Sequence, residues 1–309
     1  MVTVTLGPDG RTAPPDPDPV ARLPRRFRLS RAAVEHVAAR TGTPLPWERR
    51  PAPSATARAL DAEGPVAPEP EPADPEGELR RLRLMTAAGD LEPEVAAAMA
   101  VFGAPEVLVD VDVSVRRAEA PAGFAQVHAW QRFRGGRVSS LSTAGGRHME
   151  LGWFDDDLWQ VELARALTVR VPVTRVAPPA PVVDLPHELL LGSGEALRLH
   201  REDVLAELVR RHAGGVLADD DPAPLGVTRT GEQLRLLHGA TVGRMRTVVA
   251  GVGTTGARKV GWVSWLLFPD GWRALTPYVR DGEPRVRVHP VEPLRLGVEV
   301  ARLVTGVRG

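Results

Sequence analysis

Most of the stretch from Val107 to Leu167 is written a second time between Met245 and Val304. The first copy reads VLVDVDVSV, a glycine-containing loop, VHAWQRF, the turn RGGR, VSSLSTAGG and HMELGWFDDDLWQVELARAL. The second reads MRTVVAGV, a glycine-containing loop, VSWLLF, the turn PDGW, RALTPYVRDG and RVRVHPVEPLRLGVEVARLV. Trp130 aligns with Trp265 at one constant offset through the middle of the copies. The pattern predicts an internal duplication.

Each copy has the pattern of a strand meander followed by a helix. From Val107 to Val115, valines alternate with other residues, which is the period of a half-buried strand. The turns at 134–137 and 269–272 contain glycine and join strands only a few residues apart, which predicts antiparallel hairpins. Acidic residues 155–157 and the pair Glu292-Pro293 favour helix starts after the last strands.

Two such units would bury their apolar faces against each other, so we expect one α+β body with quasi-two-fold symmetry. The length of 309 residues and the apolar content suit a sizeable core. The expected organisation is a disordered N-terminal tail (1–26), a single domain (27–309) with pseudo-repeats at about 78–167 and 188–304, and a proline-rich segment (44–75).

The remaining elements follow from capping and periodicity. Ser30 caps a helix that should run to Arg40 and stop at Gly42. Further helices are expected at 78–88, 93–102, 195–211 and 232–238. The proline-rich stretch 172–186 is expected to cross between the copies without joining an interior strand.

Composition excludes several function classes. The 39 acidic and 39 basic residues balance, so nothing marks a nucleic-acid binder. Cysteine is absent, which rules out disulfides, thiolate metal sites and cysteine nucleophiles. No stretch approaches the roughly 20 apolar residues of a membrane span, and the first ten residues, MVTVTLGPDG, do not have a signal-peptide pattern. We therefore expect a cytoplasmic protein that binds neither nucleic acid nor membrane.

Apparent catalytic motifs have simpler explanations. Gly251, Gly253 and Gly256 spell G-x-G-x-x-G, but a strand follows where the dinucleotide fingerprint needs a helix, so a hairpin loop is predicted. Gly192-Ser193-Gly194 does not have the spacing of a nucleophile elbow, and the scattered histidines predict no metal site. Trp130 and Trp265 are expected in the sheet core. These residues favour a binding or scaffolding protein over an enzyme, with no cofactor required.

Several stretches together resemble the EspG family of ESX (type VII) secretion-associated chaperones over roughly 27–303. They are FRLSRAAVEHVAARTG, PEVLVDVDVSV, AWQRFRGGRVSSLSTAGG, ELGWFDDDLWQVELARAL, GWRALTP and VEVARLV. The resemblance implies a central antiparallel sheet flanked by helical bundles. It also implies a cytosolic chaperone that binds the apolar tip of a helical PE/PPE-type substrate, keeps it soluble and targets it for secretion, as a monomer or weak homodimer.

The family resemblance places partner contacts on the loop after the first long strand, here 116–124, and on the neighbouring helical bundle. In this chain the expected partner-binding residues are Arg116, Arg117, Phe124, Gln126 and His128. Arginine and aromatic residues are enriched at interface hot spots. A flexible hairpin connection is the structural alternative for this loop.

Two other functions stay open at this stage. One is an enzyme that uses the cleft between the halves, with Asp110, Asp112 and His128 as acid and base. The other is an oligomeric scaffold joined through sheet edges.

Overall fold

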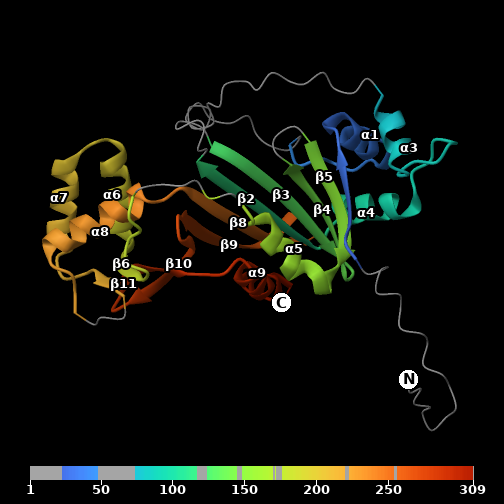
Figure 1. Ribbon diagram of the computed structural model, residues 1–309. Helices are drawn as coiled ribbons and strands as arrows, with labels where there is room; N and C mark the ends of the chain where they lie inside the picture. The colour runs from blue at the N-terminus through green and yellow to red at the C-terminus, as the bar shows by residue number, and fades with distance from the viewer. Residues whose placement is uncertain are drawn as a thin grey trace, which may run out of the picture.

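The computed structural model describes residues 23–47, 74–116, 124–144, 148–169, 171, 176–219, 223–253 and 256–308, without the side chains of 124, 144, 257–259 and 308. These residues form an α+β fold around one antiparallel sheet, in the order β1-β5-β4-β3-β2-β8-β9-β10-β11-β6-β7 (Figure 1). Its strands are β1 (Arg25–Leu29), β2 (Val107–Arg116), β3 (Phe124–Arg134), β4 (Arg137–Ala144), β5 (His148–Asp155), β6 (Val183–Pro186), β7 (Leu217–Ala218), β8 (Gly243–Gly253), β9 (Gly256–Phe268), β10 (Gly271–Arg280) and β11 (Glu283–Pro290).

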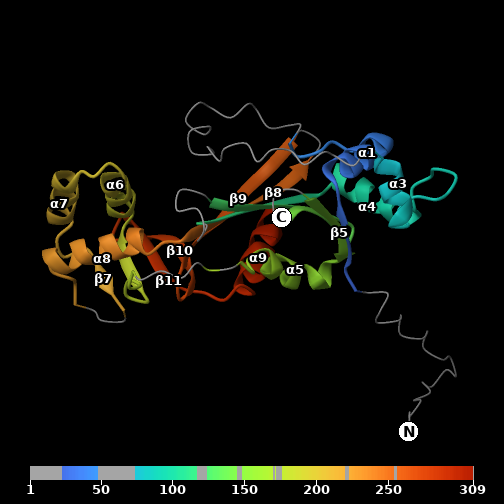
Figure 2. The same cartoon turned by 45° about the horizontal axis from the view of Figure 1, so that its top comes forward.

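The helices form three groups around the sheet. Figure 2 shows two groups on one side of the sheet, at opposite ends, and the third group on the other side. The first group is α1 (Arg31–Thr41), α3 (Pro75–Arg81) and α4 (Pro93–Gly103), the second is α6 (His187–Arg198), α7 (Glu202–Arg211) and α8 (Val227–Gly239), and the third is α5 (Trp159–Ala166) and α9 (Arg295–Arg308).

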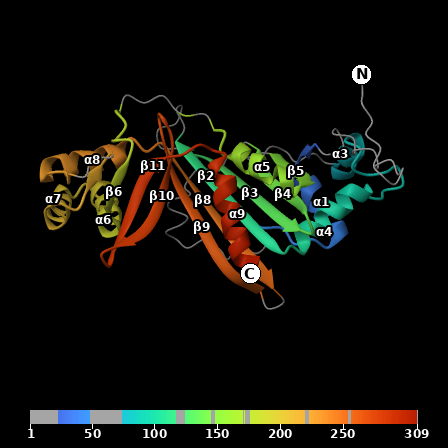
Figure 3. The same cartoon turned by 90° about the horizontal axis from the view of Figure 1, so that it is seen from below.

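The pairing of β2 with β8 is the centre of the sheet. Val111 lies opposite Thr247 in this antiparallel ladder, and a meander continues outward on each side of it. The five alternating valines from Val107 to Val115 are buried, so the period-two prediction is confirmed. They pack with α5 and α9, which cross this face of the sheet in Figure 3.

Helices α5 and α9 touch each other closely as they cover this face. A Cβ on Gly297 of α9 would lie 2.6 Å from the Cα of Gln160 in α5, a separation that real structures do not tolerate. A Cβ on Gly251 of β8 would come within 3.0 Å of the Val307 carbonyl oxygen. The glycine-rich run that mimics a dinucleotide fingerprint therefore serves helix packing and the β8–β9 hairpin, where Gly253 pairs with Gly256.

Local turn and cap predictions agree with the structure. Ser30 accepts a hydrogen bond from the Ala33 amide, and Gly42 takes the left-handed conformation that ends α1. In the turn between β3 and β4, Gly135 and Gly136 both have positive φ, as a tight hairpin needs.

Other expectations are wrong in detail. Helix α3 spans Pro75–Arg81 and not 78–88, because Arg83 has a positive φ. The helix expected at 195–211 is two helices, broken where His200 has a positive φ. Helix α8 is longer than 232–238, and α9 begins just after Glu292-Pro293. Strand β1 begins within the expected N-terminal tail, while residues 1–22 and 48–73 lie outside the described residues.

The stretch 172–186 was expected to avoid interior strands, and this is wrong at its end. Val183–Pro186 is strand β6, which pairs with β11 on one side and with β7 on the other. The strand tolerates Pro186 because this residue is its last position, where the ladder ends.

Trp130 and Trp265 align in the sequence, but they do not occupy equivalent positions in the structure. Trp130 packs with the cluster under α1, α3 and α4, whereas Trp265 packs under α5 and α9 on the opposite face. Because a shift of one residue moves a strand side chain to the other face, the two tryptophans are not equivalent positions. The meander β2-β3-β4-β5 is mirrored by β8-β9-β10-β11, but β7 at the far edge has no counterpart beyond β1, and the internal duplication stays a hypothesis.

Candidate functional site

The outer face of the central strands lies between the two helical groups that cover the ends of the sheet. Asp110 of β2 pairs with Trp130 of β3 and with Val248 of β8, and Val248 pairs with Trp262 of β9. Directly opposed residues share a face of a sheet, so these four side chains form one row across four strands. We call this surface, from β3 to β9, the open face.

Apolar side chains on the β8–β9 side of the open face are exposed to solvent. Trp262 is 64% exposed and Val260 is 57% exposed, and Val252 beside them is 36% exposed. Large exposed apolar groups that gather in one place mark interaction sites more often than isolated ones do. This part of the open face is therefore an exposed apolar surface on the central strands.

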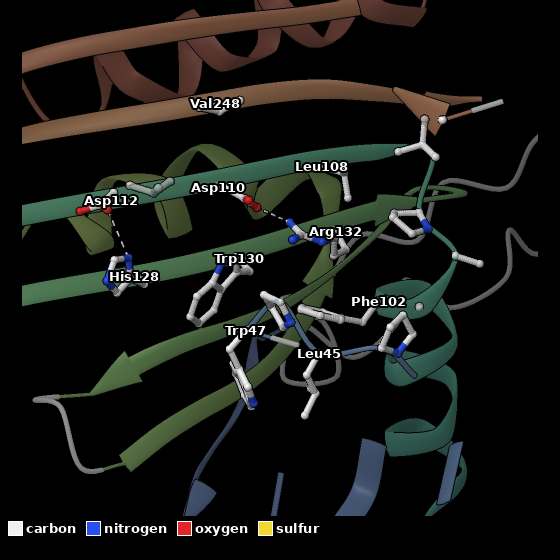
Figure 4. Close-up of a pocket in the computed structure, with 18 of the residues that line it drawn as sticks. Leu45, Trp47, Phe102, Leu108, Asp110, Asp112, His128, Trp130, Arg132 and Val248 are labelled. Atoms are coloured by element: carbon white, nitrogen blue, oxygen red, sulfur yellow. Dashed lines mark hydrogen bonds and ion pairs between the residues drawn. The ribbon is translucent and has the colours of Figure 1, made fainter. Parts of the chain in front are cut away.

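The β2–β3 side of the open face contains a cavity of about 790 Å³, which is large enough for a peptide segment or a small molecule. Figure 4 shows Trp47 and Phe102 approaching it from one side and Asp110, Asp112 and Val248 from the sheet. Its wall opposite the sheet comes from the chain after α1 and from the end of α4. Lining residues are Pro44, Leu45, Pro46, Trp47, Phe102, Gly103, Ala104, Pro105, Leu108, Asp110, Val111, Asp112, His128, Trp130, Arg132, Arg246, Val248, Val252 and Gly256.

Polar groups in the cavity are paired across strands β2 and β3. Arg132 donates to a carboxylate oxygen of Asp110 at 2.6 Å, and its guanidinium lies 5.2 Å from the Phe102 ring. His128 Nδ1 lies 3.3 Å from Asp112 Oδ2. Both carboxyl groups keep about half of their surface exposed, at 50% for Asp110 and 46% for Asp112. Each can therefore accept further hydrogen bonds from a bound molecule.

Aromatic rings complete the wall of this cavity. The Trp130 ring stacks on His128 with centroids 5.8 Å apart, and its other neighbour, Trp47, meets it edge-on at 5.8 Å. Both indoles are half-buried. Rigid aromatic groups bind a partner at a low cost in conformational entropy, so the cavity is suited to anchoring a side chain.

The acid–base residues of the enzyme hypothesis do meet in this cavity. Asp110, Asp112 and His128 all line it, and Asp112 Oδ2 lies 3.3 Å from His128 Nδ1. Among the described residues, those that line the cavity include no serine, threonine, cysteine, tyrosine or lysine that could act as a nucleophile. No group of three potential metal ligands occurs in the part of the chain that the structure describes. The arrangement therefore offers proton transfer and binding as its chemistry.

A second polar pair lies within the α6–α8 group. Ser193 Oγ is 2.9 Å from His238 Nε2 and also donates to the Leu190 carbonyl oxygen. Ser193 is fully buried, and burial lowers the pKa of His238. Because the Ser193 hydroxyl is buried, we interpret this pair as a structural hydrogen bond between α6 and α8.

The predicted partner-binding residues lie where β2 ends and β3 begins, which we call the β2–β3 end of the open face. The exposed side chains of Val260 and Trp262 lie farther along this face, on β9. Arg116 ends β2 and is exposed, as is Gln126 on β3. His128 is brought into the cavity, and its Nε2 lies 3.3 Å from Gln126 Oε1. Arg117 lies outside the described residues, and Phe124 is described in its backbone alone, as the first residue of β3.

Sequence reasoning missed Trp262, Val260 and the cavity wall around Trp47. Both faces of β9 read as apolar in VGWVSWLLF, so periodicity could not tell which face a helix covers. The presence of two tryptophans three residues apart was the available signal, because side chains at odd spacing point to opposite faces of a strand.

No helix within the described ranges is long and apolar enough to cross a membrane.

No family model matches the sequence, and no curated protein matches it. Among solved structures, the chain is similar to the Mycobacterium tuberculosis type VII secretion system chaperone EspG5, solved in complex with the PE25–PPE41 dimer. The TM-score is 0.51 at 15% identity, over 90% of this chain and 95% of that chain. A second structure, GphF dehydratase 1, gives a TM-score of 0.08 at 12% identity over 64% of this chain and 84% of that chain, a score too low to indicate a shared fold.

Proposed function

We infer that the likeness of this fold to that of EspG5 extends to its function. We propose that the protein is a cytosolic chaperone of a type VII (ESX) secretion system, which binds a helical PE/PPE-type substrate, keeps it soluble and targets it for secretion. The protein acts as a monomer or weak homodimer and needs no cofactor.

The observation that carries this proposal is the uncovered apolar surface at Trp262 and Val260, on a fold of this kind. An apolar helical tip aggregates in water, and a partner that covers it removes that surface from self-association. Binding to the folded substrate also shifts its equilibrium away from aggregation by mass action. The open face has the chemical character that such a partner needs.

We assign partner contacts to two adjoining regions of the open face. One is the β2–β3 end, with Arg116, Gln126 and His128 among the described residues, and with Arg117 and Phe124 proposed from the sequence. The other is the exposed row of β8 and β9, centred on Trp262. The strand register places both regions on one side of the sheet, so a single partner could contact both.

The test is co-expression of a PE–PPE pair with the wild-type chain or with Trp262→Ala/Val260→Ala. We expect the wild type to keep the pair soluble and to co-elute with it. Truncation of a hot-spot tryptophan costs about 2 kcal/mol or more, so the affinity of the variant should fall about thirtyfold. Soluble yield of the pair and complex formation by size-exclusion chromatography are the measurements.

Val279→Ala is the matched control, because Val279 is 69% exposed but lies on β10, away from the central strands. It should bind like the wild type. A PE–PPE pair that is equally soluble without the chaperone would contradict the proposal. Equal binding by all three proteins would instead show that the partner contacts lie away from Trp262 and Val260.

The cavity contact between Asp112 and His128 specifically favours one other function, proton-transfer catalysis on a small molecule. Asp112→Asn distinguishes the two, because Asp112 is one of the two groups that would transfer the proton and is not among the proposed partner contacts. A chaperone with this variant should still keep its substrate soluble, whereas an enzyme would lose turnover and its pH dependence.

A further inference from the structure

Three arginines lie together at the β2–β3 end of the open face. Arg244 of β8 is directly opposite Ser114, and Arg246 is directly opposite Asp112. Arg116 ends β2 beside the start of β8, and its amide donates to the Val242 carbonyl oxygen at 2.7 Å. All three residues are exposed. The apolar row of Val248 and Trp262 follows next along the same face.

Within the part of the chain that the structure describes, no ion pair is formed by any of these three guanidinium groups. Arg244 donates to the neutral hydroxyl of Ser114 at 3.3 Å. Asp112, opposite Arg246, has its carboxylate 3.3 Å from His128. By contrast, several exposed arginines on helices are paired with carboxylates of the same helix, at 2.8 Å for Arg31–Glu35.

The grouping has an electrostatic cost that a partner could relieve. Residues two apart on a strand are about 7 Å apart on the same face, so Arg244 and Arg246 repel each other. The repulsion is weak in water, but it grows when a partner covers the surface and removes solvent. A carboxylate supplied by the partner would replace this repulsion with attraction and would fix the orientation in which the partner docks.

We infer that the partner segment seated on the open face carries aspartate or glutamate beside an apolar ridge. Its carboxylates lie on Arg116, Arg244 and Arg246, and its ridge lies on Val260 and Trp262. The inference rests on the proposed function and adds the recognition chemistry of the partner. Charge determines the direction of docking, and the apolar row supplies most of the affinity.

A nucleic-acid phosphate would also suit arginines, but the remainder of the face disfavours it. Beside the exposed ring of Trp262, Val252 and Val260 offer branched aliphatic surface, which does not stack on bases as aromatic rings do. The chain as a whole has a formal charge of zero. An acidic helical protein segment is therefore the occupant that these residues favour.

The test uses two helical peptides with the same leucine ridge, one ending in a run of glutamates and the other in a run of glutamines. The full-length chain should bind the glutamate peptide about tenfold more tightly at low salt, from several exposed ion pairs acting together. The preference should largely disappear at about 0.5 M NaCl. Fluorescence anisotropy of labelled peptides measures both affinities.

Arg244→Glu/Arg246→Glu should reverse the preference, so that a peptide ending in lysines binds best. The matched control is Arg295→Glu/Arg302→Glu, an equal charge change on α9 at exposed positions across the sheet. It should leave the preference for glutamate intact. Circular dichroism of each variant checks that the fold is retained.

Equal affinity for the glutamate and glutamine peptides, or no binding of either, would overturn the inference. Neither result affects the proposed function, which is judged by solubility of the PE–PPE pair. A single-stranded oligonucleotide serves as a third probe, and its binding in preference to the acidic peptide would also overturn the inference.

Discussion

Among the described residues, helices cover the outer face of the sheet over β4 and β5 and leave it uncovered over β8 and β9. Trp153 of β5 is 6% exposed, because α1, α3 and α4 pack over its neighbourhood and Phe27 stacks on it at 5.4 Å. Trp262 of β9 is 64% exposed on the same sheet. The same side-chain type thus contributes to the core in one region and leaves a free apolar surface in the other. The difference separates residues needed for folding from residues available for a partner.

The largest expected effect tests this contrast with one substitution in each region. Trp153→Ala should lower the free energy of unfolding by about 3–5 kcal/mol, since it leaves a cavity in a packed cluster. Trp262→Ala should change stability by no more than about 0.5 kcal/mol, because its side chain already contacts water. Urea unfolding followed by circular dichroism measures both. A strong loss of stability in Trp262→Ala would show that β9 is covered in solution.

The intermediate effect is a loss of stability at the opposite face of the sheet, where α5 and α9 pack against each other. Gly297→Ala should destabilise the protein by about 1–3 kcal/mol, because the new Cβ meets the backbone of Gln160 at the helix crossing. Gly306→Ala, in the same helix, has nothing within 4 Å of the new Cβ. That control should be neutral or stabilise the helix by up to about 1 kcal/mol. Similar unfolding midpoints for the two variants would contradict the close crossing.

The smallest effect is a dependence of protein stability on pH, which comes from His238 in the α6–α8 group. Burial lowers the pKa of His238, so the folded state favours the neutral ring, whereas the unfolded state binds a proton near the ordinary value of 6.5. Stability should therefore fall as the pH drops below about 6.5, by at most about 1.4 kcal/mol per pH unit. Thermal unfolding between pH 7 and pH 5 measures it.

His238→Gln should remove this part of the acid sensitivity. The control His187→Gln changes an exposed histidine of the same helical group and should leave the acid sensitivity unchanged. If both variants keep the wild-type pH profile, His238 does not titrate differently in the folded state.

Local features of the fold followed from the sequence because short-range chemistry fixes them. The Ser30 cap, the glycines at 135 and 136 and the alternating valines of β2 each encode their own geometry. What covers each face did not follow, because it depends on contacts between distant segments. Trp265 and Trp262 look alike in sequence, yet α9 covers the first and no described helix covers the second.

The candidate site was predicted only in part, because some of its residues are brought together by contacts between distant segments. The β2–β3 end was reached through the family resemblance, and the pairing of Asp112 with His128 follows from strand register. The cavity depends on Trp47 and Phe102, which arrive from chain segments far from β2 in sequence. No periodicity within the strands could indicate that wall.

Hydroxyl-radical footprinting of the free chain and of its complex with a PE–PPE pair tests the central claim most directly. Trp262 should be readily oxidised in the free protein and protected in the complex, whereas buried Trp153 should react slowly in both. Equal oxidation of Trp262 with and without the bound pair would show that the partner docks elsewhere and would contradict the assignment of the open face.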